Sequence, residues 1–207
     1  MSFFKVLVIG DVGVGKTSLV NRIVYNTFTE KYKATIGCEF GLKIIEINGE
    51  PVRVQLWDLA GQDRLGGISR LYCRDANGAL VVTDATREGT LEQASLWKGS
   101  VDDNVRLPDG SPIPMVLVAN KADLLVPGSG MTSDDLSRFA NQRQFVASYM
   151  TSSKVGTNAN EALVRLVEEI MKRSQAKEDT VEDAVRGMGG KKLDASKKKE
   201  DNGKCAC

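Results

Sequence analysis

The segment Gly10–Thr17 constrains this chain most, because it joins a strand-like run to a helix-like pattern. Residues 3–9 are mainly apolar, as in a buried strand, and apolar residues then return at helical spacing from Leu19 to Ile23. A strand, a loop of the form G-x-x-x-x-G-K-[ST] and a helix start are the setting of a phosphate-binding loop, or P-loop. The sequence therefore predicts a polyphosphate site between the first strand and the first helix.

Each part of this loop has a physical task at such a site. The glycines, Gly13 and Gly15 among them, let backbone N–H groups around Val14 point at a phosphate, and the helix N-terminus adds the positive end of its dipole. Lys16 brings a positive charge to the outer phosphates, and the Thr17 hydroxyl is a ligand for Mg²⁺.

Composition excludes several other classes of protein. The 207 residues carry a net charge of +1 and no basic stripe interleaved with aromatic residues, so nucleic acid is not an expected partner. No run reaches the roughly 18 apolar residues of a membrane span, Met1–Lys5 lacks the layout of a signal peptide, and Ser2 excludes N-myristoylation. The absence of histidine excludes imidazole bases and histidine-type zinc sites. Four cysteines without a secretory signal indicate a reducing compartment and no disulfide framework.

Residues 1–173 alternate apolar runs with amphipathic stretches, which predicts a doubly wound α/β domain: six strands, mostly parallel, with helices on both faces. Asn48-Gly49 predicts a tight hairpin, so the strands on either side of it are the expected antiparallel pair. Ser133 is the expected N-cap of the third helix. The expected strands are 3–9, 39–47, 52–58, 79–84, 115–120 and 146–150, and the expected helices are 16–25, 91–105, 133–145 and 159–173.

The composition changes at Ser174, after which bulky apolar residues are few and charged residues dominate. Such a segment cannot bury enough surface to fold, so residues 174–204 are expected to form a disordered tether. The last three residues, 205–207, contain two cysteines, which lipidation, a metal or a terminal disulfide would each suit. Lys204 occupies the first place of the last four residues, so the ending is not C-a-a-X.

Asn120–Asp123 identifies the base of the expected nucleotide. The motif follows an apolar run, which puts it at the carboxyl end of a strand, where open α/β sheets bind ligands. The Asp123 carboxylate can accept from N1–H and the 2-amino group of guanine, whereas adenine lacks that amino group and its N1 would oppose the carboxylate. Asn120 can steady the loop, and the Lys121 stem can lie across the ring. A guanine nucleotide is therefore the expected ligand.

A second group of residues points to phosphate chemistry. Asp58 ends a strand and can hold Mg²⁺ through water, while the Gly61 N–H can meet a γ-phosphate. Gln62 is the candidate to orient the attacking water, and Thr35 is a candidate second hydroxyl ligand of Mg²⁺.

Together these motifs closely resemble the small GTPases of the Ras superfamily, and within them the Rab family. The resemblance covers about residues 3–173 and the last three, and it implies the P-loop NTPase fold of a small G-domain. Residues 107–120, with the run Trp57–Gln62, look most like the subgroup that serves lysosome-related organelles. The general motifs are Gly10–Ser18, Thr35–Gly37, Trp57–Arg64, Asn120–Asp123 and Thr151–Lys154; the Rab-type stretches are Ile36–Phe40, Arg53–Trp57, Arg64–Ser69, Tyr72–Ala76, Leu80–Thr86 and the final Cys-x-Cys.

The resemblance implies roles for further residues. Phe28 would pack against guanine, and Ser153 and Lys154 would offer backbone N–H groups to its O6. Ser152 is a further residue expected to bind the nucleotide. Thr35 and Gly61 would anchor two switch segments, near 29–41 and 60–76, that order with GTP and relax with GDP. The expected effector surface is Phe40, Trp57 and Tyr72.

The resemblance also implies a membrane-anchored switch that hydrolyses GTP to GDP and phosphate in vesicle trafficking. Its implied partners are an exchange factor, a GTPase-activating protein, effectors, and an escort protein or GDP dissociation inhibitor. Geranylgeranyl groups on Cys205 and Cys207, with the lysines of 191–204, would hold it on the cytoplasmic face of endomembranes, from which it cycles through the cytosol.

Val12 departs from the glycine or small residue usual in the family. A β-branched side chain there points toward the γ-phosphate region, where an activating protein inserts its finger, so crowding would slow hydrolysis. The alternative is that a larger residue is normal in this subgroup. Two other functions stay open: a GTP-binding module with negligible turnover, and a P-loop kinase or ATPase, against which Asn120–Asp123 argues.

Overall fold

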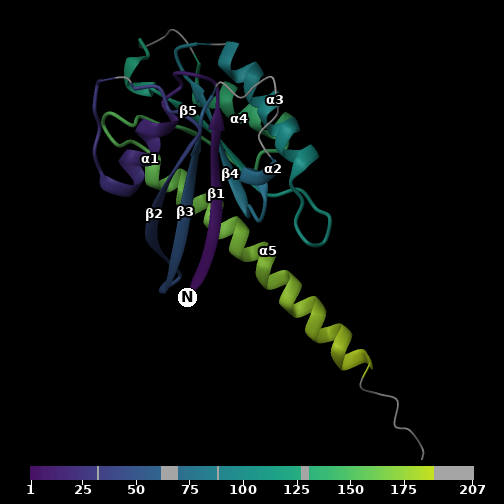
Figure 1. The fold of residues 1–207 in the computed structure, drawn as a ribbon. Helices are drawn as coiled ribbons and strands as arrows, with labels where there is room; N and C mark the ends of the chain where they lie inside the picture. The colour runs from purple at the N-terminus through teal and green to yellow at the C-terminus, as the bar shows by residue number, and fades with distance from the viewer. Residues whose placement is uncertain (32, 62–69, 88, 127–130, 189–207) are drawn as a thin grey trace, which may run out of the picture. The chain divides into compact units, whose positions relative to one another are not determined.

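The computed structural model describes residues 1–31, 33–61, 70–87, 89–126 and 131–188, with residues 70, 71 and 176–188 described by their backbone alone. In this part of the chain six strands form one sheet in the order β2-β3-β1-β4-β5-β6 (Figure 1). β2 is antiparallel to β3, and the other pairs are parallel, which confirms the predicted sheet. The strands are β1 Ser2–Gly10, β2 Cys38–Ile47, β3 Glu50–Leu59, β4 Gly78–Asp84, β5 Met115–Asn120 and β6 Ala147–Met150.

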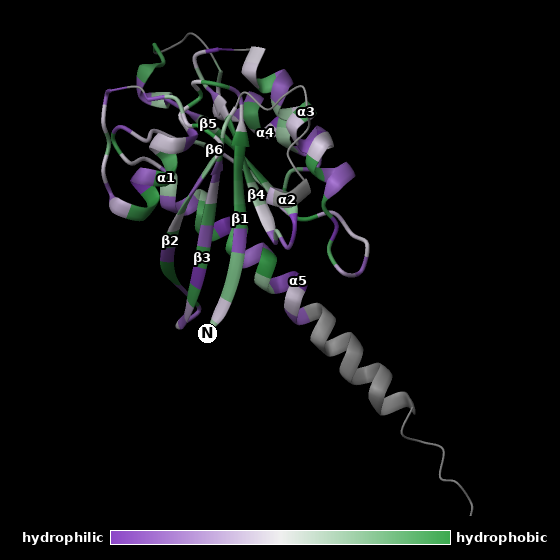
Figure 2. Cartoon of the chain, in the orientation of Figure 1, coloured by the Kyte–Doolittle hydropathy of each residue, from purple (hydrophilic) through white to green (hydrophobic). Residues whose placement is uncertain are grey.

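Helices cover both faces of the sheet because alternate residues of the central strands are apolar in both directions. On β1, Val6 and Val8 pack in one cluster with Leu163, while Leu7 and Ile9 face the other cluster. Figure 2 shows β1 as largely apolar, as a strand buried on both faces requires. The first cluster includes residues of α1 and α5, and the second includes residues of α3 and α4. The helices are α1 Lys16–Tyr25, α2 Arg70–Cys73, α3 Gly89–Asn104, α4 Ser133–Gln142 and α5 Ala159–Met188.

The β2–β3 hairpin forms where Asn48-Gly49 predicts it. Ile47 pairs with Glu50 across the turn, and Asn48 and Gly49 have φ values of 52° and 80°. Positive φ at both central residues is what a type I′ turn needs. The parallel pairing of β1 with β3, in which Val8 lies opposite Asp58, brings Asp58 to the same end of the sheet as Gly10.

The N-cap predicted for helix α4 is wrong by one residue. Thr132, and not Ser133, is the N-cap of α4: its hydroxyl accepts from the Asp135 N–H, and the Asp135 carboxylate accepts from the Thr132 N–H. This reciprocal pair is a capping box, which needs its acid three residues after the cap, and that spacing selects Thr132. The short helix α2 was not expected either.

By its internal contacts the chain divides into Met1–Lys172 and Arg173–Cys207. The helix expected over 159–173 continues to Met188, into the segment where the tether was expected to begin. The stretch 174–188 contains no proline, the residue that most strongly disfavours a helix interior. Residues 189–207 lie outside the described residues, and the tether there stays a prediction. No described helix combines the length and the apolar character needed to cross a membrane.

Candidate functional site

A cavity of about 600 Å³ opens at the carboxyl ends of the parallel strands, a size that suits a nucleotide. Most of the nucleotide-binding residues expected from the sequence line it. Val14 and Ser152 do not; they are buried behind the wall. The expected residues that line the cavity are Gly13, Gly15, Lys16, Thr17, Ser18, Phe28, Thr35, Gly61, Asn120, Lys121, Asp123, Ser153 and Lys154.

The P-loop runs from the end of β1 into α1 and leaves the helix start open. Gly15 is the N-cap residue with a φ of 96°, and it has no side chain to occupy the first N–H groups of α1. A Cβ at Gly15 would overlap the side-chain nitrogen of Asn120, so the position requires glycine for space as well as conformation. The first turn of α1 is thus open to an anion.

Lys16 lies inside this loop with a side chain that is almost fully buried. Its Nζ donates to the carbonyl oxygens of Gly10 and Asp11, each at 2.8 Å. Burial lowers the pKa of Lys16 to about 8, and the charges of Asp58 and Asp11 oppose this shift. An ammonium held by two carbonyls at the wall of the cavity is well placed to receive phosphate oxygens.

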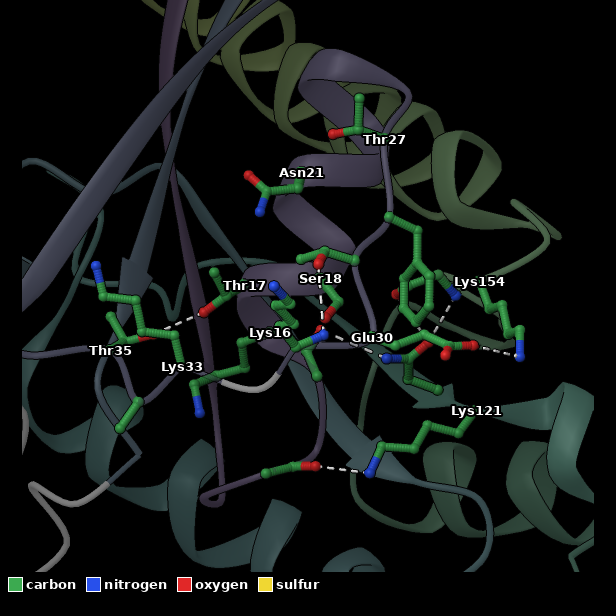
Figure 3. Close-up of a pocket in the computed structure, with 18 of the residues that line it drawn as sticks. Lys16, Thr17, Ser18, Asn21, Thr27, Glu30, Lys33, Thr35, Lys121 and Lys154 are labelled. Atoms are coloured by element: carbon green, nitrogen blue, oxygen red, sulfur yellow. Dashed lines mark hydrogen bonds and ion pairs between the residues drawn. The ribbon is translucent and has the colours of Figure 1, made fainter.

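Three oxygen-bearing side chains meet beside the P-loop. Thr17 Oγ1 is 2.7 Å from Thr35 Oγ1 and donates to Asp58 Oδ2 at 2.5 Å; Figure 3 shows Thr35 and Thr17 facing each other. Asp58 is 1% exposed, and its Oδ1 has no hydrogen-bond partner in the described structure. Burial raises the pKa of Asp58, while the Thr17 hydrogen bond and the Lys16 charge oppose the rise.

This trio fits Mg²⁺, which prefers hard oxygen ligands and keeps several of its waters. An orphaned, buried carboxylate oxygen next to two hydroxyl groups is the feature that a hydrated cation would satisfy. Among the described residues there is no group of three or more acidic, cysteine or histidine side chains that would hold a metal alone. Phosphate oxygens would therefore have to supply part of the coordination.

The opposite end of the cavity is organised by Asn120, the last residue of β5. Its Oδ1 accepts from the Ser153 N–H and the Ser153 hydroxyl, both at 3.0 Å, and its Nδ2 donates to the Val14 carbonyl at 3.1 Å. One buried amide thus ties the base loop, residues 151–154, to the P-loop. The Ser152 hydroxyl donates to Asp123 Oδ1 at 2.5 Å, which orients the carboxylate expected to read guanine. Val14 and Ser152 therefore support the site from behind.

Lys121 and Asp84 make a second link between the two loops. Lys121 Nζ lies 2.7 Å from both the Gly13 carbonyl and Asp84 Oδ2 (Figure 3 shows the first bond). Arg87 donates to the same Asp84 oxygen at 3.0 Å and to the Val12 carbonyl at 3.3 Å. Burial would raise the pKa of Asp84, but hydrogen bonds from Lys121 and Thr86 hold that pKa below its ordinary value.

The sequence patterns did not indicate that Asp84 and Arg87 belong to the site. Asp84 is the last residue of β4 and pairs in register with Asn120 at the end of β5. Because the carboxyl ends of neighbouring parallel strands meet at one edge of a sheet, the acid at the end of the predicted strand 79–84 was the signal that could have found it.

Val12 lines the cavity and is 42% exposed, so its side chain stands at the mouth. A Cβ at Gly61 would come within 2.6 Å of the Val12 backbone nitrogen, so the P-loop and the end of β3 are in close contact here. This places Val12 where the crowding hypothesis needs it, without testing the hypothesis. Gln62, the expected water-orienting residue, lies outside the described residues, as do Cys205 and Cys207.

The three aromatic residues expected to bind effectors form a chain outside the cavity. The ring centroids of Phe40 and Trp57 are 6.1 Å apart, and those of Trp57 and Tyr72 are 6.3 Å apart. Phe40 is 66% exposed, and Lys5 Nζ lies 3.9 Å from the centre of the Trp57 ring. The strand β2, the strand β3 and the helix α2 each contribute one ring to this surface.

Residues 5–172 match the Ras family. The chain is 42% identical to "Ras-related protein Rab-32" of Sus scrofa over 205 residues, which cover 99% of this chain and 88% of the relative. It is 40% identical to "Ras-related protein Rab-32A" of Dictyostelium discoideum over 88% of this chain and 84% of the relative. It is 41% identical to "Ras-related protein Rab-7L1" of Rattus norvegicus over 89% of each chain.

Proposed function

Since the chain belongs to the Ras family and, within it, to the Rab small GTPases, we propose that it is a membrane-anchored switch in vesicle trafficking that recruits effectors when GTP is bound. The reaction is hydrolysis of GTP, in which water attacks the γ-phosphorus and GDP and phosphate leave. One observation carries the proposal. One cavity is lined by Lys16, Thr17 and Thr35 at one end and by Asn120, Asp123, Ser153 and Lys154 at the other. Behind this lining, Asp58 accepts from the Thr17 hydroxyl, and the Ser152 hydroxyl donates to Asp123.

The two ends of the cavity divide the work of binding. The P-loop amides and Lys16 hold the phosphates, and Asp123 accepts from N1–H and the 2-amino group of guanine. Thr17, Thr35 and Asp58 would hold Mg²⁺, directly or through water, and the ion would neutralise charge on the β- and γ-phosphates. Phe28 packs on the base, and the Lys154 N–H donates to O6. In the structure the Ser153 N–H donates to Asn120, so O6 would share or compete for it.

Hydrolysis rests on positioning, since the chain has no histidine to act as a base. Gln62 orients the attacking water, and Thr35 and Gly61 bind near the γ-phosphate. Loss of that phosphate releases both residues, which relaxes the switch segments and changes the surface made by Phe40, Trp57 and Tyr72. Effectors that read this surface therefore bind the GTP state, and an exchange factor and a GTPase-activating protein set the time spent in it.

Anchoring is proposed for the C-terminus. Geranylgeranyl groups on Cys205 and Cys207, aided by the lysines of 191–204, would hold the protein on the cytoplasmic face of endomembranes, with lysosome-related organelles as the candidate compartment. An escort protein or GDP dissociation inhibitor would carry it through the cytosol. Mass spectrometry of the C-terminal peptide from expressing cells tests this: two C20 additions support it, and unmodified cysteines contradict it.

Single-turnover phosphate release from GTP and ATP, with Mg²⁺ present, tests the catalytic part. The expected result is slow release from GTP, none from ATP, and further slowing in Gln62→Leu. Tight GTP binding with no phosphate release would favour the GTP-binding module with negligible turnover. Release from ATP at a comparable rate would contradict the assignment of the base.

A further inference from the structure

Arg22 in the last turn of α1 donates four hydrogen bonds to the back of the base end of the cavity. Its Nε donates to the Ser153 carbonyl at 2.8 Å, and its Nη2 donates to the Lys154 carbonyl at 2.7 Å. Its Nη1 donates to the Asn26 carbonyl at 3.0 Å and to Asn26 Oδ1 at 2.9 Å. No role of Arg22 in nucleotide binding follows from the P-loop or from the guanine-recognition motif.

These bonds join two walls of the cavity that are far apart in sequence. One wall is the segment after α1, where Asn26 is the C-cap and the residues from Thr27 to Glu30 line the cavity. The other wall is the loop that contributes Ser153 and Lys154. A second link, the ion pair of Lys154 Nζ and Glu30 Oε1 at 3.0 Å, closes the exposed side (Figure 3). Both of its partners are at least half exposed, so solvent weakens that link. The Arg22 bond to the Ser153 carbonyl is half-buried, and the other three Arg22 bonds are exposed.

The bond to the Ser153 carbonyl also sets the direction of a neighbouring donor. In a trans peptide unit the C=O and the N–H point to opposite sides. The carbonyl of Ser153 and the N–H of Lys154 belong to one such unit, so fixing the carbonyl on Arg22 directs the Lys154 N–H away from Arg22. The other nearby amides are engaged: the Ser153 N–H donates to Asn120, and the Val155 N–H donates to the Ser152 hydroxyl.

We propose that Arg22 is a positioning residue for guanine, which aims the Lys154 N–H at O6 and holds the wall that carries Phe28 against the base. The proposal rests on the proposed function of this cavity as a guanine nucleotide site. Its consequence is specific: loss of Arg22 weakens recognition of the O6 edge of the base, while recognition of the 2-amino group by Asp123 persists.

The test compares three ligands, GDP, 6-thio-GDP and IDP, by displacement of a fluorescent GDP from the full-length protein. Sulfur at position 6 is a poor acceptor, and IDP lacks the 2-amino group. The variants are Arg22→Gln, which removes the guanidinium, and Arg22→Lys, which keeps the charge but can reach fewer carbonyls. Arg165→Gln is the matched control, because it removes an arginine that pairs with Glu169 on α5 instead.

In Arg22→Gln we expect GDP affinity to fall about tenfold and the preference for GDP over 6-thio-GDP to shrink, with the preference for GDP over IDP unchanged. Arg22→Lys should lie between wild type and Arg22→Gln, and Arg165→Gln should match wild type. An equal loss of affinity for all three ligands, or a lower thermal midpoint with unchanged preferences, would overturn the proposal by showing a purely structural role. If wild type itself prefers GDP over neither analogue, the guanine site fails, which is a different result.

Discussion

Lys121 Nζ lies 2.7 Å from Asp84 Oδ2, which joins the ends of two adjacent parallel strands beneath the cavity. The same ammonium donates to the Gly13 carbonyl, so one lysine connects the guanine-recognition loop, the end of β4 and the P-loop. Asp84 is 2% exposed and also accepts from Arg87, whose guanidinium reaches the Val12 carbonyl. The base end and the phosphate end of the site are therefore coupled through one buried carboxylate.

Asp84→Asn should release GDP faster than wild type, by at least about tenfold, because a hydrogen bond to a charged group contributes about 1.5–3 kcal/mol. Stopped-flow measurement of labelled GDP release gives the rate. Asp102→Asn is the control: Asp102 pairs with Lys98 at 2.6 Å on α3, away from the P-loop, and the charge change is the same. Equal release rates for the two variants would show that Asp84 does not couple the loops.

Thr17→Val should remove most of the effect of Mg²⁺ on GDP release, because the substitution keeps the shape of threonine and deletes the hydroxyl beside Asp58. Loss of a direct ligand should lower the affinity for Mg²⁺ by at least about tenfold, since loss of a supporting group already costs that much. Release rates with Mg²⁺ and with EDTA give the measurement. Thr27→Val, which alters a threonine lining the other end of the cavity, should keep the wild-type ratio; a wild-type ratio in Thr17→Val would refute the metal site.

Val12→Gly should hydrolyse GTP at the wild-type intrinsic rate if a larger residue is normal in this subgroup. The Val12 side chain is exposed at the mouth of the cavity, which is compatible with that result. Single-turnover assays of both proteins, alone and with a matched GTPase-activating protein, give the comparison. Faster hydrolysis in Val12→Gly, most of all with the activating protein, would instead support crowding of a finger that contributes about 10³–10⁵ in rate.

Nucleotide binding should take up a proton at pH 9 to a greater extent than at pH 7. In the nucleotide-free protein the pKa of Lys16 is about 8, so the amine is largely neutral at pH 9, and phosphate oxygens favour its charged form. Affinity should accordingly fall as the pH rises above about 8. Isothermal titration calorimetry in buffers of different ionisation enthalpy measures the uptake; equal uptake at the two pH values would mean that Lys16 is already charged before binding.

Local patterns in the sequence were enough to place most of the fold and the cavity. The offsets from Gly10 to Thr17, the turn signal of Asn48-Gly49 and the alternating apolar runs each act over a few residues. The same holds for Asn120–Asp123, which the sheet carries to the cavity because it follows a strand. The family comparisons confirm the resemblance to Rab proteins that these motifs indicated.

Features that depend on distant contacts could not be read in this way. Arg22 donates to the carbonyl of Ser153, 131 positions away in the sequence, and no local pattern predicts that contact. Asp84 becomes informative only once β4 is set beside β5. At Thr132 and Ser133 the signal was local but ambiguous, because two adjacent hydroxyl residues can each cap a helix, and only the position of Asp135 decides between them.

Guanine binding and GTP hydrolysis can be tested together by purifying the protein without added nucleotide, denaturing it, and identifying by chromatography what it releases. We expect GDP in an amount close to that of the protein, since the site binds guanine and the protein hydrolyses GTP. Release of mostly GTP would mean that hydrolysis is stalled, and Val12 would be the first residue to change. Release of adenine nucleotides, or of no nucleotide, would show that this cavity is not a guanine nucleotide site.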